Sequence, residues 1–107
     1  MSVERIRALN DQLRTTLTGG KAFMTPGIAA LGPEPVQRLV TAIATFDDFC
    51  VANDPHGEHD FGMFEFEGSS IIFKIEYFDA NFEFGSPDPA DPTVTQRAIT
   101  LMLAEEY

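Results

Sequence analysis

Residues 61–78 read FGMFEFEGSSIIFKIEYF, and apolar side chains alternate with polar ones along most of this stretch. An apolar residue at every second position is the pattern of a half-buried β-strand. The alternating apolar positions are Phe64, Phe66, Ile71, Phe73, Ile75 and Tyr77. Gly68 and Ser69 lie between the two halves and suit a two-residue hairpin turn. The stretch therefore predicts an antiparallel hairpin with one apolar and one acidic face.

A third alternating run follows this hairpin, after a turn near residues 79–80. Phe82 and Phe84 alternate there with Asn81 and Glu83. This pattern predicts a third strand whose two phenylalanine rings join the core. The loop over residues 86–92 contains three prolines, which excludes a central strand.

Helical spacing of apolar residues predicts helices on both sides of the strands in the chain. The first helix begins near Ser2, a capping residue, and ends before Gly19 and Gly20. A short strand over residues 21–25 follows it. The expected apolar stripe of this helix is Ile6, Leu9, Leu13 and Leu17.

A second helix follows the prolines at positions 33 and 35, and its apolar stripe extends to Cys50. We expect Cys50 to be buried as a small hydrophobic side chain. A last helix is predicted after Asp91, which would cap it, and Pro92. The apolar positions assigned to these two helices are Val36, Leu39, Val40, Ile43, Phe46 and Cys50, and Val94, Ala98, Leu101 and Met102.

These elements predict a single α+β domain over residues 1–107. Its architecture is expected to be a small antiparallel β-meander of three to four strands, with helices packed on one face. Nothing in the sequence requires a metal or cofactor for folding. One cysteine excludes an intramolecular disulfide and favours a reduced, cytoplasmic setting, and no signal peptide or membrane-spanning segment is visible.

Negative charge dominates the chain and is unevenly distributed. The formal charge is -10, and residues 45–92 hold twelve acidic residues against Lys74 alone. This excess argues against direct binding of nucleic acid or of an anionic membrane. It favours a basic protein or nucleoprotein complex as the partner of a monomer or weak dimer.

Acidic side chains of the predicted strands and following loops are the candidate partner-binding residues. Carboxylates two residues apart on a strand are separated by about 7 Å, comparable with successive phosphates of a nucleic-acid strand. A rigid acidic sheet could therefore occupy a basic groove built for DNA or RNA; alternatively, the acidity only maintains solubility. The candidates are Glu65, Glu67, Glu76 and Glu83 in the sheet, extended by Asp79, Asp88 and Asp91.

The loop before the hairpin offers a different hypothesis, a metal site built on Glu58, His59 and Asp60, with His56 nearby. Imidazole and carboxylate groups are common ligands of divalent metals. Their spacing matches no established zinc or calcium pattern. The alternative is that these side chains hold the loop against the first strand of the hairpin.

Several motifs resemble a small bacterial family known as domain of unknown function 3768. They are residues 6–11 (IRALND), 18–20 (TGG), 53–55 (NDP), 57–62 (GEHDFG), 74–79 (KIEYFD), Ser86 with 88–92 (DPADP) and 100–107 (TLMLAEEY). The family has no assigned activity. Short proteins of this kind resemble accessory genes of plasmids and phages, which implies an inhibitor of the anti-restriction or anti-CRISPR type.

The sequence thus predicts a non-enzymatic acidic protein that binds a basic partner. Two alternatives stay open, a metal-binding module or metal-dependent enzyme using Glu58, His59 and Asp60, and a general interaction domain.

Overall fold

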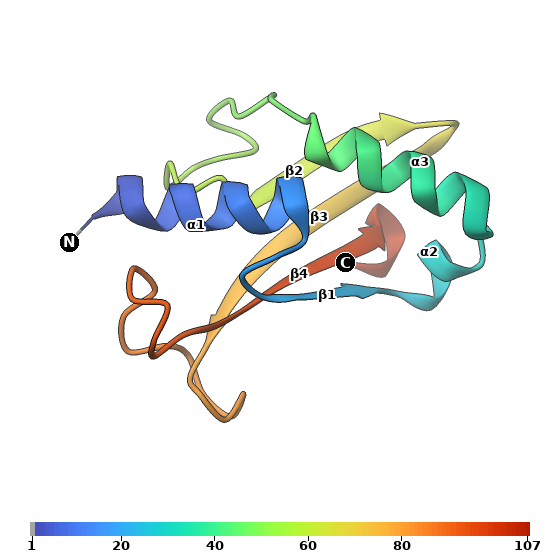
Figure 1. Ribbon diagram of the computed structural model, residues 1–107. Coiled ribbons are helices and arrows are strands. Elements are labelled where there is room, and N and C mark those ends of the chain that lie inside the picture. The colour runs from blue at the N-terminus through green and yellow to red at the C-terminus, as the bar shows by residue number, and fades with distance from the viewer. Residues whose placement is uncertain (1) are drawn as a thin grey trace.

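The computed structural model describes residues 2–107 and has the predicted α+β architecture (Figure 1). A four-stranded sheet is covered on one face by two helices. Its elements are α1 (Val3–Thr16), β1 (Lys21–Met24), α2 (Pro26–Ala29), α3 (Pro33–Ala44), β2 (Phe61–Phe66), β3 (Ser69–Phe78), β4 (Gln96–Leu103) and the 3₁₀ turn η1 (Ala104–Glu106). No helix within residues 2–107 is long and apolar enough to cross a bilayer.

The sheet is mixed, with the strand order β1-β4-β3-β2. The β2–β3 hairpin predicted from the sequence is confirmed, and its antiparallel register pairs Phe61 with Lys74. Its turn is formed by Glu67 and Gly68 rather than by the expected Gly68 and Ser69, and their φ values of 47° and 87° are those that a hairpin turn of type I′ requires. β4 is antiparallel to β3, whereas β1 is parallel to β4. The short strand expected at residues 21–25 therefore makes the sheet mixed.

The core lies between the sheet and the two long helices. Phe73 is fully buried in the centre of β3, beneath Leu13 of α1 and Leu39 of α3. Gly62 is needed beside this ring, because a Cβ atom there would collide with Phe73 and Phe46. Ser2 caps α1, since its hydroxyl accepts a 3.0 Å hydrogen bond from the Arg5 N–H.

The predicted last helix is wrong, because the residues assigned to it form strand β4. Ile99, Leu101 and Met102 are buried, although neighbours in a strand point to opposite faces of the sheet. β4 lies between β1 and β3, and the chain after it returns over the face opposite the helices. Both faces of β4 are thus covered, and its apolar residues do not follow a period of two.

Two other local predictions are also wrong. Phe82 and Phe84 lie in a turn after β3 rather than in a strand, and both are exposed. The second helix ends at Ala44, so Cys50 lies in the following loop and is exposed rather than buried. The prediction that the first helix ends before Gly19 is confirmed, since α1 ends at Thr16 and its C-cap Leu17 has a φ of 55° in the left-handed region.

Candidate functional site

All seven basic side chains of the protein contact groups of the protein itself. Arginine N–H groups donate to carbonyl or carboxylate oxygens, and the lysines approach a carboxylate or an aromatic ring. The partners include Ala90 O for Arg5, Gly57 O for Arg7, Ile43 O for Arg14, Glu67 for Arg38, Asn10 for Arg97, Glu76 for Lys74 and the Phe82 ring for Lys21. Within residues 2–107, only Asp11, Glu67 and Glu76 form ion pairs with lysine or arginine. The remaining carboxylates there have no such counter-charge.

The glutamates predicted to share one face of the sheet do not lie together. Glu65 and Glu76 lie on the outer face, opposite the helices, where Glu65 accepts a hydrogen bond from Ser70 and Glu76 lies 3.6 Å from Lys74. Glu67 occupies the β2–β3 turn and accepts hydrogen bonds of 2.7 and 2.9 Å from Arg38, which lower the pKa of its carboxyl. Glu83 lies beyond β3. The expectation of one continuous acidic face is therefore wrong.

The outer face is chemically mixed. Alternation along the paired strands places Lys74 on it with Phe61 and Met63 of β2 and Phe23 of β1. Met63 and Phe23 are each half exposed. Lysine and apolar side chains separate the carboxylates of this face. The outer face therefore carries no continuous row of negative charge.

Residues 79–91, which we call the acidic loop, contain the other predicted candidates. Asp79 accepts hydrogen bonds from the backbone N–H groups of Glu83 (3.0 Å) and Asn81 (3.1 Å). Asp91 accepts from the hydroxyl and the N–H group of Thr93, and Asp88 accepts from the N–H group of Ala90 at 3.2 Å. These bonds hold the turns of the loop in place.

The same hydrogen bonds favour the ionised state of two loop carboxyls. The pKa of Asp79 is lowered chiefly by the N–H group of Glu83, and that of Asp91 chiefly by the hydroxyl of Thr93. Both stay charged because their charged forms accept the bonds. Turn formation and negative charge are therefore properties of the same side chains.

Two phenylalanines lie among the acids of this loop, and the Phe82 ring packs on Phe78 at a centroid distance of 5.4 Å. Phe84 is 72% exposed, and Phe82 has a φ of 57°, in a region that bulky residues rarely adopt. Backbone hydrogen bonds join Asp79 N–H to Phe84 O (2.8 Å) and Ser86 N–H to Tyr77 O (3.1 Å). The loop is thus a stiff extension of β3, which Figure 1 shows protruding from the end of the sheet away from α3.

Sequence reasoning placed both phenylalanines in the core and so missed this feature. The missed signal is the surrounding Asp79, Asn81 and Gly85, which are typical of turns rather than strands.

The loop that contains Glu58, His59 and Asp60 does not bring these three side chains to one point. Glu58 accepts a hydrogen bond of 2.7 Å from the Tyr77 hydroxyl. The His59 ring stacks on Phe49 at a centroid distance of 3.7 Å, and its Nδ1 donates to Asp11 at 2.8 Å. No group of three or more His, Cys, Asp or Glu residues among residues 2–107 could hold a metal ion. Contacts within the fold thus account for Glu58 and His59.

A polar network lies beneath this loop and consists of Asn10, Glu58, Tyr77 and Arg97. Asn10 is fully buried; it donates to Tyr77 Oη (2.8 Å) and accepts from Arg97 Nε (2.6 Å). Arg97 is 2% exposed, and its guanidinium lies 5.0 Å from the Tyr77 ring centroid. Burial, and then the Glu58 carboxylate, raises the pKa of Tyr77 well above its usual range. The network joins α1, β3 and β4.

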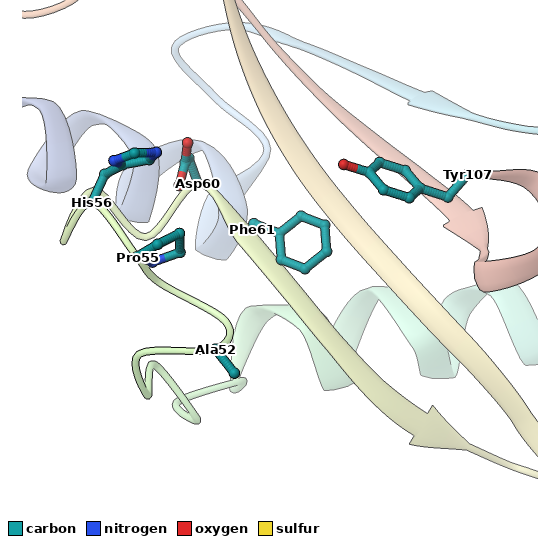
Figure 2. Close-up of a pocket in the computed structure, with 6 residues that line it drawn as sticks. All are labelled: Ala52, Pro55, His56, Asp60, Phe61 and Tyr107. Carbon is teal, nitrogen blue, oxygen red and sulfur yellow. The ribbon is translucent and has the colours of Figure 1, made fainter.

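A separate pocket of about 280 Å³, which we call the outer pocket, opens between this loop and the start of β2 (Figure 2). Its lining residues are Ala52, Pro55, His56, Asp60, Phe61 and Tyr107. The rings of Phe61 and Tyr107 are 5.9 Å apart, centroid to centroid. Burial, and to a smaller degree the charges of Glu58 and Asp54, raises the pKa of Asp60. The sequence singled out Asp60 but not the two rings that accompany it.

Comparison with known proteins gives one match. The model of a family described as "Protein of unknown function (DUF3768)" matches residues 24–106. No curated protein and no solved structure matches the chain.

Proposed function

The chain belongs to the DUF3768 family of proteins of unknown function, and we propose that it is a non-enzymatic acidic binding protein that engages a basic protein partner. The partner-binding surface in this proposal is the acidic loop, residues 79–91. Glu65 and Glu76 of the outer sheet face form a second, weaker part of that surface.

The observation that carries this proposal is a difference between the basic and the acidic side chains in the partners that they have within the protein. The basic side chains are occupied by the protein's own oxygens and rings, while Glu83 and Asp88 are exposed and lack a cationic partner. The excess of carboxylates that gives the net charge of -10 therefore lies at the surface of the protein. A field of one sign speeds association with an oppositely charged surface and selects against acidic partners.

Phe84 supplies the apolar anchor that charge alone does not give. Large aromatic side chains at the centre of an interface carry much of its binding energy, and charged residues around them contribute chiefly to specificity and rate. Phe84 is 72% exposed between Glu83 and Gly85, and Asp79 fixes the turn that presents it. This arrangement suits an apolar pocket on the partner that is bordered by lysine or arginine.

A nucleic-acid-binding groove is the basic surface that this proposal specifies. Such grooves are lined by lysine and arginine because they neutralise phosphates. An acidic protein seated in one would act as an inhibitor, of the anti-restriction or anti-CRISPR type. The separation of Glu65, Glu67, Glu76 and Glu83 argues against imitation of a phosphate row by the sheet, and favours engagement through the loop.

Three matched variants test the proposal in a pull-down from bacterial lysate after nuclease treatment. The loop variant Glu83→Lys/Phe84→Ser changes two side chains that accept no hydrogen bond and are exposed. The sheet variant is Glu65→Lys/Glu76→Lys. The control variant Glu34→Lys/Val51→Ser makes the same type of change elsewhere, since Glu34 is exposed and Val51 is 86% exposed.

We expect the wild type and the control to capture the same nucleic-acid-handling protein, and the loop variant to lose it. The sheet variant should retain part of the binding. Added duplex DNA or RNA should release the captured protein, because both ligands compete for one groove. Capture that survives the loop substitution, or that nucleic acid does not compete with, would contradict the proposal. Circular dichroism of each variant verifies that its fold is intact.

A further inference from the structure

We propose that the outer pocket binds the guanidinium group of an arginine side chain, which packs against the adjoining rings of Phe61 and Tyr107 and donates to the Asp60 carboxylate. This inference deepens the proposed function and rests on it in one respect, namely that the arginine belongs to the basic partner. The pocket is a site separate from the acidic loop.

The Asp60 carboxylate is the charged group that the fold leaves unused. Within residues 2–107, it receives no hydrogen bond from another residue and forms no ion pair, although it is only partly exposed. The backbone carbonyl of Asp60 accepts a 2.8 Å hydrogen bond from Ile75 N–H, which ties this residue to β3. A hydrogen bond from its own backbone N–H lowers the pKa of the Asp60 carboxyl less than burial raises it, so a cationic donor would further stabilise the ionised carboxylate.

The surroundings of Asp60 favour a cation over an anion. Asp54 and Glu58 carry the same charge nearby and, after burial, raise the pKa of Asp60, while His56 lowers it. Binding a cation would relieve the repulsion among these carboxylates.

The aromatic pair supplies the second recognition element. Phe61 and Tyr107 are inclined to each other by 58°, and the Nζ of Lys74 lies 5.9 Å from the Tyr107 ring centroid. Aromatic faces attract cations, and arginine stacks on them through its planar guanidinium. Figure 2 shows the Tyr107 ring directed toward the side on which Phe61 and Asp60 lie, with His56 next to Asp60.

The size of the pocket limits its occupant. Its volume of about 280 Å³ is at the lower limit of sites for small molecules, which range over about 300–1,000 Å³. A single side chain suits such a site better than a nucleotide or a larger cofactor. Arginine also forms two parallel hydrogen bonds with one carboxylate, a geometry that lysine lacks.

The test uses a capped arginine, N-acetyl-arginine methylamide, added to ¹⁵N-labelled protein and followed by amide chemical shifts. We expect saturable shifts centred on residues 52–61 and 107, with a dissociation constant of about 1–10 mM, as befits a single exposed side chain. The uncharged analogue N-acetyl-citrulline methylamide, which has nearly the same shape, should cause none. The capped lysine should bind more weakly.

Two substitutions locate the site. Asp60→Asn keeps the shape of the side chain and should weaken binding at least tenfold, and Tyr107→Ser, at a residue that is 74% exposed, should weaken it severalfold. The matched control Asp48→Asn removes an exposed charge from the preceding loop and should change nothing. Equal shifts in Asp60→Asn, or equal shifts with citrulline, would overturn the assignment. Because no partner protein is present, this result is independent of the pull-down on which the proposed function depends.

Discussion

The polar network contains a buried charged group, whereas the acidic loop keeps its charged groups at the surface. In the network, the Arg97 guanidinium is buried, and oxygens of Asn10 and Pro89 accept its hydrogen bonds. In the loop, carboxylates remain ionised at the surface, and hydrogen bonds to Asp79 shape the backbone around an exposed Phe84. The buried cations Arg14 and Arg97 thus serve the interior of the fold, whereas exposed anions outnumber exposed cations at the surface.

The largest expected effect follows from removing a cation of the network. Arg97→Met should lower the free energy of unfolding by about 3 kcal/mol, because buried acceptors on Asn10 and Pro89 lose their charged donor. Urea unfolding followed by circular dichroism measures this change. Lys21→Met removes an exposed cation and should change stability by no more than about 0.5 kcal/mol. Similar losses of unfolding free energy in both variants would contradict the distinction between buried and exposed cations.

The next effect is local and lies in the acidic loop. Asp79→Ala should expose the amides of Asn81 and Glu83 to rapid hydrogen exchange without unfolding the sheet, since only the turn depends on this carboxylate. The pKa of Asp79 is lowered by these bonds, so their contribution is complete above its usual value of 3.8 and is lost as the pH falls through the lowered pKa. In the wild type, the protection of the Asn81 and Glu83 amides from hydrogen exchange should therefore be lost over the same pH range. Protection that persists in the variant would show that other contacts hold the loop.

The smallest effect concerns Asp60, which is less buried than Arg97 of the network and less exposed than Glu83 of the acidic loop. Its pKa is raised by burial, so the ionised carboxylate opposes folding above that pKa and stops doing so as the pH falls through it. Asp60→Asn should therefore be slightly more stable than the wild type at neutral pH and equally stable in acid. Thermal unfolding at several pH values measures the difference, and a variant less stable at neutral pH would imply an unrecognised donor to Asp60.

The β2–β3 hairpin was predictable because its residues obey one local pattern. Alternation and the glycine turn near residues 67–69 act within the same few residues, so sequence alone contains the information. β4 was not predictable in this way. Ile99 and Leu101 are buried on one face of β4 and Met102 on the other. Their burial depends on β1 and β3, which are distant in sequence, and on the chain after β4, which covers the outer face.

For the candidate site, the sequence showed that acidic residues are concentrated in residues 45–92 but not how they are arranged in space. Alternation alone gave Phe82 and Phe84 a place in the core, although the turn fixed by Asp79 exposes Phe84 and leaves the Phe82 ring packed on Phe78 outside the core. Asp60 was recognised, whereas its pairing with Phe61 and Tyr107 was not, because Tyr107 reaches β2 only through the tertiary structure. Local periodicity contains no information on such contacts.

The parallel pairing of β1 with β4 has a consequence for biosynthesis. Lys21 pairs with Ala98, so the sheet neighbour of β1 is β4, which is synthesised after α2, α3, β2 and β3. Until then, β1 presents Phe23 and Met24 on a strand with unsatisfied backbone groups, which is the state most prone to pairing with another chain. The nascent protein is thus exposed to aggregation from the synthesis of β1 until that of β4.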